Sequence, residues 1–123
     1  MSTAPSAVSI ENLDQPRETP EELDVSVLVP VKDEAETVEE LSRQVAKVLD
    51  GLGKSFEIVF VDDGSQDGTQ QRIKAARERD ERVKLVWLRR NFGKAAALSA
   101  GFDVCRGQVV ITMDGDLQDD PAE

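Results

Sequence analysis

The chain has 123 residues, of which 39% are hydrophobic and 33% charged, and its formal net charge is −10 at pH 7. This composition fits one globular domain and argues against general nucleic-acid binding, which needs a positive surface. The chain has no run of 18 apolar residues and no basic start followed by an apolar stretch, so the sequence predicts neither a membrane span nor a secretory signal. A single cysteine, Cys105, excludes an internal disulfide and indicates a buried thiol in a reducing, cytoplasmic compartment.

Half of the net negative charge lies at the N-terminal end of the chain. Residues 1–24 carry six acids and one arginine, and residues 25–123 carry nineteen acids and fourteen bases, so each part has a net charge of −5. Prolines at positions 5, 16 and 20, together with a lack of hydrophobic periodicity, predict a disordered or loosely docked tail over residues 1–24. The folded domain is expected to span residues 25–123.

The first half of this domain reads as strand, helix and strand. Residues 25–29 are apolar or small and predict a strand that ends at Pro30. Apolar residues then recur at helical spacing between residues 36 and 52, with glycines at the end, which predicts an amphipathic helix. Residues 56–61 are mostly apolar and predict a second strand.

The second half repeats this alternation. Ser65 or Asp67 is suited to cap the next helix, because a short polar side chain can accept a bond from the first free backbone N–H groups. Cys105 is expected inside an alanine-rich helix, and the last strand is expected to be buried on both faces because its residues are apolar or β-branched. These elements are predicted at residues 67–79 (helix), 83–88 (strand), 94–105 (helix) and 109–113 (strand).

This order, β-α-β-α-β-α-β, predicts an α/β fold, a Rossmann-like parallel sheet with right-handed crossovers and helices on both faces. In such sheets the ligand lies beyond the carboxyl ends of the strands. The unusual polar residues all follow strands, in the segments 30–34, 62–63, 89–94 and 114–120. Their common position favours a binding site over unrelated solvated loops.

The last of these segments predicts a site for a divalent metal ion. Asp114 and Asp116 are separated by one glycine, so their carboxylates can converge on one Mg²⁺ or Mn²⁺ ion that keeps open positions for a diphosphate. A solvated acidic loop is the alternative. A calcium loop is a weaker reading, because Asp119 stands where that loop needs glycine.

The segment after the second strand predicts a contact to a nucleoside. Asp62 and Asp63 are acceptors suited to a ribose hydroxyl or a base N–H, although an aspartate before Gly-Ser is also ordinary in a turn. The loop after the first strand lacks the G-x-G-x-x-G fingerprint, and the chain lacks G-x-x-x-x-G-K-[ST]. A dinucleotide-binding dehydrogenase and a P-loop protein are therefore disfavoured.

Four segments in order resemble glycosyltransferase family 2, and within it the polyprenyl-phosphate and dolichyl-phosphate sugar transferases. The resemblance covers residues 25–123. It is carried by Val25-Ser-Val-Leu-Val-Pro-Val-Lys-Asp-Glu34, Glu57-Ile-Val-Phe-Val-Asp-Asp-Gly-Ser-Gln-Asp-Gly-Thr69, Arg90-Asn-Phe-Gly-Lys94 and Met113-Asp-Gly-Asp-Leu-Gln-Asp-Asp-Pro121.

The resemblance implies the GT-A fold, a UDP- or GDP-linked sugar donor and a Mg²⁺ or Mn²⁺ cofactor. It implies metal ligands at Asp114, Asp116 and Gln118. It places Pro30, Lys32, Glu34 and Asp63, with Asp62 beside them, in the nucleoside pocket, and it leaves Lys94 and Arg90 near the diphosphate or on a solvated surface. Lys32 departs from the family, which often has an aromatic side chain there to stack on the base; the lysine stem can cover a base instead.

The implied reaction is inverting sugar transfer, plausibly to a polyprenyl phosphate. No catalytic base is identified, and Asp119 and Asp120 are the spare acids near the metal motif. The chain is expected to be the N-terminal, donor-binding half of a longer enzyme, truncated and inactive alone, which lies at the cytoplasmic face of a membrane in its full-length form. The oligomeric state, nucleotide, sugar and acceptor stay open.

Two other classes of protein fit parts of the pattern. A non-catalytic nucleotide-sugar-binding module would bind the same donor with metal and show no turnover. A haloacid dehalogenase phosphatase or a phospho-receiver also places aspartates at strand ends. The phosphatase needs its D-x-D motif on an early strand, whereas Asp114 and Asp116 follow the fourth predicted strand.

Overall fold

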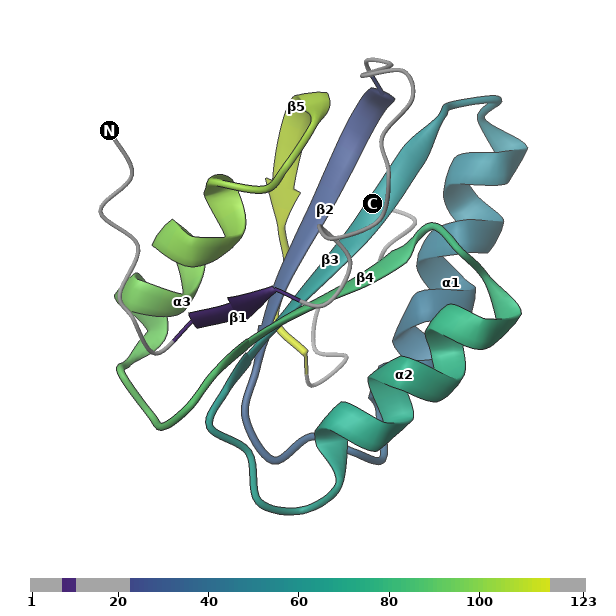
Figure 1. Ribbon diagram of the computed structural model, residues 1–123. Coiled ribbons are helices and arrows are strands. Elements are labelled where there is room, and N and C mark those ends of the chain that lie inside the picture. The colour runs from purple at the N-terminus through teal and green to yellow at the C-terminus, as the bar shows by residue number, and fades with distance from the viewer. Residues whose placement is uncertain (1–7, 11–22, 116–123) are drawn as a thin grey trace.

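The computed structural model describes residues 8–10 and 23–115 of the chain. Figure 1 shows one sheet flanked by helices, and the predicted alternation of strands and helices is confirmed from β2 to β5. The elements are β1 (Val8–Ile10), β2 (Leu23–Val31), α1 (Val38–Gly51), β3 (Phe56–Asp63), α2 (Thr69–Arg79), β4 (Val83–Leu88), α3 (Lys94–Phe102) and β5 (Gly107–Thr112).

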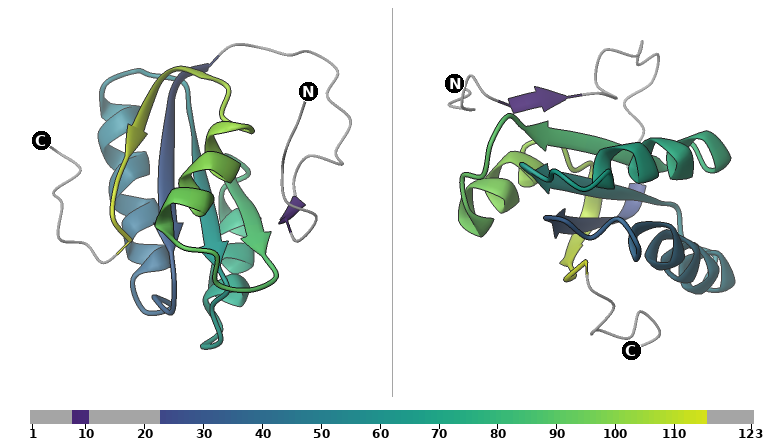
Figure 2. Two further views of the ribbon diagram at one scale, coloured as in Figure 1. Left: turned by 90° about the vertical axis from the view of Figure 1, so that its left-hand side faces the viewer. Right: turned by 90° about the horizontal axis from the view of Figure 1, so that it is seen from below.

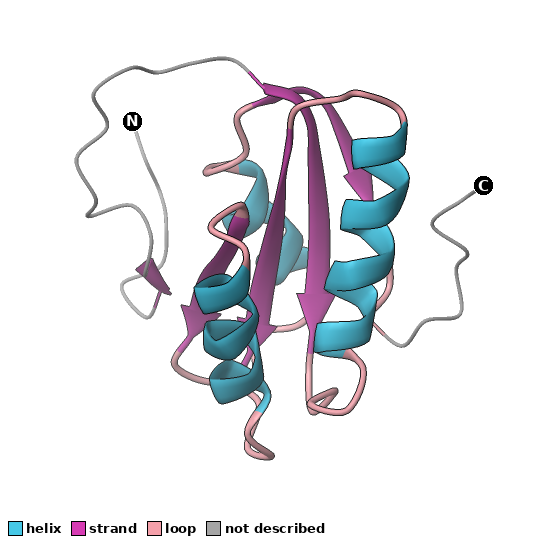
Figure 3. Ribbon diagram, turned by 90° about the vertical axis from the view of Figure 1, so that its right-hand side faces the viewer, coloured by secondary structure: helices cyan, strands magenta, loops and turns pink. Residues whose placement is uncertain are grey.

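The strands form one sheet in the order β1-β4-β3-β2-β5. The pairs β2–β3, β3–β4 and β2–β5 are parallel, as predicted, and β1 pairs with β4 antiparallel. Helices α1 and α2 cover one face and α3 covers the other, which the end-on view in Figure 2 shows as three layers. Figure 3 shows α1 and α2 lying side by side in front of the strands.

Each face of the sheet has its own apolar core, because successive side chains of a strand point to opposite faces. In β2, Val27 and Val29 pack in the core beneath α1 and α2, whereas Leu28 packs in the core beneath α3. Helix α3 approaches the sheet closely at Gly101, where an added Cβ would lie 2.2 Å from Leu28 Cδ1. The two cores fix which loops can meet at the ends of the strands.

Strand β2 does not end at Pro30, as the sequence predicts, but continues to Val31. Pro30 instead limits the pairing of β2 with β5. The N–H of Met113 donates to the Leu28 carbonyl (3.0 Å), and residue 30 would donate the next bond on this side of β2. Proline has no N–H, so the pairing with β5 ends at Leu28 and Thr112 while the pairing with β3 goes on.

Two predictions for the C-terminal elements are wrong. Helix α3 ends at Phe102, so Cys105 lies beyond it in a turn and is half-buried. Strand β5 is not buried on both faces: Val109 is 55% exposed and Ile111 is 43% exposed. The reason is position, because β5 is at the edge of the sheet and no described element covers these two side chains.

The N-terminal boundary also differs from the expectation. A strand is predicted to start at residue 25, but β2 begins at Leu23, and the structure places Val8–Ile10 in a short strand alongside β4. Residues 1–7 and 11–22 of the expected tail lie outside the described residues. Within the described part, no helix is long and apolar enough to cross a membrane.

Candidate functional site

A cavity of about 470 Å³ opens at the carboxyl edge of the sheet, where the sequence predicts the ligand. It gathers six of the predicted site residues, which lie at or just beyond the carboxyl ends of β2, β3, β4 and β5. These are Pro30, Lys32, Glu34, Asp63, Lys94 and Asp114. The remaining lining residues are Val31, Asn91, Gly93, Ala97 and Gly115.

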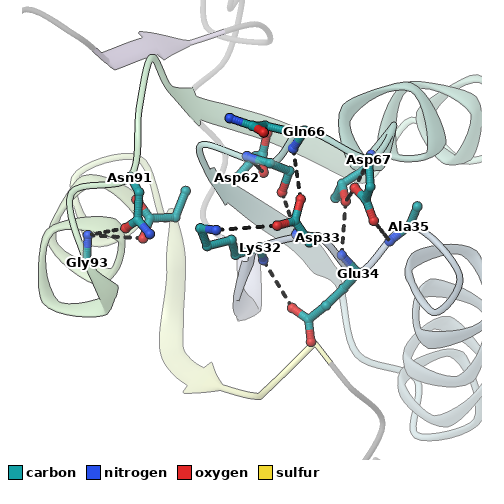
Figure 4. Close-up of polar contacts among 12 residues, drawn as sticks. Lys32, Asp33, Glu34, Ala35, Asp62, Gln66, Asp67, Asn91 and Gly93 are labelled. Carbon is teal, nitrogen blue, oxygen red and sulfur yellow. Dashed lines mark hydrogen bonds and ion pairs between the residues drawn. The ribbon is translucent and has the colours of Figure 1, made fainter.

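The loop after β2 is held against the loop after β3 by Asp33. The backbone N–H of Asp33 donates to Ser65 Oγ (2.7 Å), and the N–H of Gln66 donates to Asp33 Oδ1 (2.8 Å). Asp33 has a φ of 54°, a left-handed conformation that aspartate tolerates better than most residues. Figure 4 shows these contacts beside Lys32, whose ammonium lies 3.3 Å from Asp33 Oδ2.

Asp67 makes a second link between the same two loops. Its Oδ1 accepts from the backbone N–H of Thr69 (3.0 Å) at the start of α2, and its Oδ2 accepts from the N–H of Ala35 (3.3 Å). The hydroxyl of Thr69 also donates to this carboxylate, and this bond is the main reason why the pKa of Asp67 lies below its usual value. The prediction that Ser65 or Asp67 caps α2 is wrong, because Gly68 is the N-cap and no side chain makes a cap hydrogen bond; Asp67 lies one residue before it.

Asp62 lies beneath the turn after β3. Its side chain is fully buried, and its two oxygens accept from the backbone N–H of Ser65 (3.1 Å) and from Gln70 Nε2 (2.7 Å). Asp62 is absent from the cavity wall. The turn role that the sequence left open for this residue is the one its contacts support.

Asp63 faces the cavity and also anchors the loop after β4. Its oxygens accept from the backbone N–H groups of Phe92 (2.8 Å) and Gly93 (3.1 Å), and the residue is 6% exposed. The neighbouring Gly64 allows the two loops to approach closely: its φ is 79°, and an added Cβ would lie 2.6 Å from the backbone nitrogen of Asn91.

Asp114, the first residue of the predicted metal motif, lines the cavity. Asp114 Oδ1 lies 2.9 Å from Lys94 Nζ, and both side chains are largely exposed. The next residue, Gly115, is held from the side of α1, because the Thr37 hydroxyl donates to its carbonyl (2.5 Å). A Cβ at Gly115 would lie 2.6 Å from Val31 Cγ1 and 2.9 Å from Glu34 Oε1, so a larger residue here requires these side chains to shift.

The described part of the predicted metal site fits a hard cation in ligand chemistry but is incomplete. Asp114 presents carboxylate oxygen to the cavity, the ligand type that Mg²⁺ and Mn²⁺ prefer. The other two expected ligands, Asp116 and Gln118, lie outside the described residues, as do Asp119 and Asp120. Among the residues that the structure does describe, no group of three or more His, Cys, Asp or Glu side chains could hold a metal ion.

Arg90, which the resemblance leaves near the diphosphate, does not line this cavity. Its guanidinium lies over the Phe92 ring, 4.8 Å from the centroid. It lines a neighbouring cavity of about 450 Å³ together with Lys32 and Arg89. The structure thus separates Arg90 from Lys94, although only three residues lie between them.

Sequence reasoning missed Thr37, Asn91 and Gly93 as parts of the site. Thr37 precedes α1 and acts through a backbone carbonyl, so no spacing in the sequence points to it. Gly93 contributes a backbone N–H, and Asn91 Oδ1 accepts from the same N–H (2.9 Å). The signal that was available is the glycine before Lys94, which marks a turn at the start of a helix.

Residues 26–123 match the sequence profile of Glycosyl transferase family 2, so the chain belongs to this family. Among curated relatives, the chain is 48% identical over 100 residues to "Undecaprenyl-phosphate 4-deoxy-4-formamido-L-arabinose transferase" of Pseudomonas paraeruginosa and 42% identical over 100 residues to the protein of the same name from Salmonella paratyphi B. Each alignment covers 80% of this chain. It covers 30% of the first relative and 31% of the second, so the chain spans about a third of their length.

Solved structures show the same architecture. The mannosyltransferase PcManGT from Pyrobaculum calidifontis, in complex with GDP-Man and Mn²⁺, is similar with a TM-score of 0.67 and 28% identity over 85% of this chain and 32% of its own. S. aureus TarS 1-349 in complex with UDP has a TM-score of 0.62 and 27% identity over 76% of this chain and 27% of its own. The predicted Rossmann-like half of a GT-A fold is confirmed.

Proposed function

We propose that this chain is the donor-binding part of a metal-dependent, inverting glycosyltransferase that takes a UDP- or GDP-sugar and transfers the sugar to a polyprenyl phosphate. The observation that carries the proposal is the cavity at the carboxyl edge, which Asp63 lines together with the ion pair of Lys94 and Asp114. Similarity to PcManGT, which was solved with GDP-Man and Mn²⁺, and to TarS, solved with UDP, supports a nucleotide donor.

The charges on the cavity wall suit a nucleoside diphosphate in company with a cation. Lys32 and Lys94 carry positive charge for the phosphate oxygens, and Pro30 and the lysine stem offer apolar surface to a base. Asp114, with Asp116 and Gln118, is proposed to hold Mg²⁺ or Mn²⁺. The bound metal ion would neutralise charge on the departing nucleoside diphosphate.

The acceptor follows from the relatives' name, which states transfer to undecaprenyl phosphate. A phosphate oxygen of the acceptor attacks the anomeric carbon, the bond from that carbon to the donor diphosphate breaks, and the configuration inverts. A phosphate is already ionised and needs no general base. A reaction that needs no general base agrees with the described part of the cavity, where the carboxylate of Asp63 already accepts from two backbone N–H groups.

Binding measured by calorimetry tests the donor and metal assignments together. UDP and GDP are titrated into the chain with Mn²⁺ and then with EDTA, and one of them is expected to bind only with the metal, because carboxylates and a diphosphate repel each other without it. Asp114→Asn should weaken the diphosphate far more than the free nucleoside. Asp103→Asn, at an exposed aspartate outside the cavity, is the matched control. Equal affinity in Mn²⁺ and in EDTA would contradict the metal assignment.

Transfer itself is proposed to need more than this chain, since the chain spans about a third of the length of its curated relatives. Positioning acceptor and donor together supplies much of the rate of a transferase. The chain is therefore expected to bind donor without transferring sugar, as a donor-binding module would. A radiolabelled donor assay with polyprenyl phosphate checks this, and metal-dependent transfer that Asp114→Ala abolishes would contradict it.

A further inference from the structure

The ion pair between Lys94 and Asp114 joins the first residue of α3 to the segment that follows β5. Its atoms Nζ and Oδ1 are 2.9 Å apart, and the side chains are 64% and 46% exposed. The pair lies on the cavity wall and not in the core. Its two members are the residues to which the proposed function gives opposite ligands, a diphosphate for Lys94 and a metal ion for Asp114.

Lys94 is poorly placed as a residue that stabilises its own helix. The N-terminus of a helix carries partial positive charge, so a lysine there is unfavourable, and α3 has no acidic residue in its first turn. The carboxylate of Asp114 offsets this charge in the structure. A bound diphosphate at the same place would offset it with more charge.

The carboxylate of Asp114 cannot serve both partners equally well. An ammonium group within hydrogen-bond distance of a carboxylate oxygen repels a divalent cation on that oxygen and competes for its lone pairs. The other charged groups on the cavity wall are Lys32, Glu34 and Asp63. Lys32 is paired with Asp33, Glu34 Oε1 accepts from the backbone N–H of Lys32 (3.1 Å), and Asp63 accepts from two backbone N–H groups. Lys94 is therefore the cation whose departure would change the charge at Asp114 most.

We propose that Lys94 is an exchangeable counter-ion of Asp114, a positioning residue that leaves the carboxylate for the donor diphosphate when Asp114 becomes a metal ligand. This inference rests on the proposed function. It makes metal and nucleotide binding cooperative, because the diphosphate removes from Asp114 the cation that opposes the metal. Coupling of this kind is reciprocal, so each ligand must raise the affinity for the other by the same factor.

The expected effect of removing Lys94 has opposite signs for the two ligands. Lys94→Met frees Asp114 and removes one positive charge, so Mn²⁺ alone should bind about three- to tenfold more tightly, as expected for an exposed pair plus one repulsive neighbour. The nucleoside diphosphate should bind more weakly in the presence of Mn²⁺. A residue that merely stabilises the fold would change both affinities in the same direction.

The test is an electron paramagnetic resonance titration of the 123-residue chain with Mn²⁺, with and without UDP or GDP. Lys32→Met is the matched control, because it removes the same charge from the same cavity but from a lysine paired with Asp33. Lys94→Met is expected to tighten Mn²⁺ alone and to reduce the gain in Mn²⁺ affinity that the nucleotide causes. Lys94→Arg keeps the positive charge, so its affinity for Mn²⁺ alone should stay closer to that of the wild type than the affinity of Lys94→Met does.

Three results would overturn the inference. Unchanged or weaker binding of Mn²⁺ alone to Lys94→Met, while the wild type still binds nucleotide only with metal, contradicts the exchange and leaves the proposed function standing. Equal tightening in Lys32→Met and Lys94→Met shows an effect of total charge and not of the pair. A wild-type chain that binds no Mn²⁺, with or without nucleotide, contradicts both proposals. Lys94 is largely exposed, and thermal unfolding of each variant confirms that the fold is kept.

Discussion

Replacing Asp63 with alanine removes the acceptor that ties the loop after β4 to the end of β3. The carboxylate accepts from the N–H groups of Phe92 at 2.8 Å and Gly93 at 3.1 Å, and the aspartate is 6% exposed. Alanine would leave both N–H groups without this acceptor, next to the cavity that Gly93 and Lys94 help to line. We therefore expect a loss of stability together with a loss of nucleoside binding.

The size of the loss follows from these two bonds. A hydrogen bond to a charged group contributes about 1.5–3 kcal/mol, and the lower value applies because Phe92 and Gly93 are half-buried. The Gly93 N–H keeps Asn91 Oδ1 as a second acceptor (2.9 Å), so the expected loss for Asp63→Ala lies between one bond and two, about 1.5–3 kcal/mol. Asp63→Asn keeps one acceptor oxygen and should lose about half as much. For a domain of this size, 1 kcal/mol shifts the Tm by about 4–8 °C, so Asp63→Ala should unfold at least about 6 °C below the wild type.

Urea and thermal unfolding of the wild type, both variants and the exposed control Asp103→Ala measure this difference. Calorimetry with a free nucleoside then separates loop anchoring from direct contact, since Asp63→Ala should weaken nucleoside and nucleoside diphosphate alike. If the free energy of unfolding of Asp63→Ala differs from that of the wild type by less than about 0.5 kcal/mol, as is typical of a surface substitution, Asp63 does not anchor the loop.

Thr37→Val removes the hydroxyl that donates to the Gly115 carbonyl at 2.5 Å. A hydrogen bond of about 1 kcal/mol predicts roughly fivefold weaker metal-dependent nucleotide binding in calorimetry, and Thr37→Ser should bind like the wild type. Equal binding by Thr37→Val would exclude this positioning role. Burial, followed by the negative charge of Glu57, raises the pKa of the Cys105 thiol to about 11, so the thiol is protonated at neutral pH. Alkylation of the folded chain should accelerate only as the pH approaches 11, and an inflection near 9 would contradict the effect of burial.

The position of the site was predictable because parallel strands bring their carboxyl ends to one edge. The division of labour between Asp62 and Asp63 was not predicted, although the sequence contains its cause. Both lie within β3, where neighbouring side chains point to opposite faces. The side chain of Asp62 lies on the same face of the sheet as Phe60, beneath α2, and accepts a hydrogen bond from Gln70. The side chain of Asp63 lies on the opposite face and accepts from the loop before α3. A prediction that ended the strand at residue 61 could not use this alternation.

The hydrophobic pattern of the sequence could not predict that side chains of β5 are exposed. An apolar, β-branched run has the same appearance in a central strand and in an edge strand, and the pairing order decides between them. Val109 and Ile111 lie opposite Val25 and Val27 of β2, on the face that carries α1 and α2. They extend that apolar row past the last described helix, and for this reason they are exposed.

At the amino ends of the strands, opposite the site, a buried carboxylate is hydrogen-bonded within the fold. Glu57 is fully buried there, and its carboxylate accepts from Ser26 Oγ (2.6 Å), Lys84 Nζ (2.9 Å) and the backbone N–H of Arg106 (2.6 Å). Among the described residues, no buried side-chain nitrogen or oxygen lacks a hydrogen-bond partner. A buried charge that is satisfied in this way has no capacity left for a ligand.

At the carboxyl edge, most of the acids are used in the same way. Asp33, Asp63 and Asp67 accept from backbone N–H groups of neighbouring loops. Asp62 accepts from the N–H of Ser65 in the turn after its own strand. The negative charge of these four carboxylates is therefore partly compensated within the fold. The number of acidic residues in these motifs therefore overestimates the negative charge that a ligand in the cavity encounters. Besides Asp63, the charged residues on the cavity wall are Lys32, Lys94, Glu34 and Asp114. Glu34 accepts from the backbone N–H of Lys32, and Asp114 is paired with Lys94. In the exchange that we propose, Lys94 turns to the diphosphate as Asp114 turns to the metal ion, so this cavity is expected to take the two ligands together.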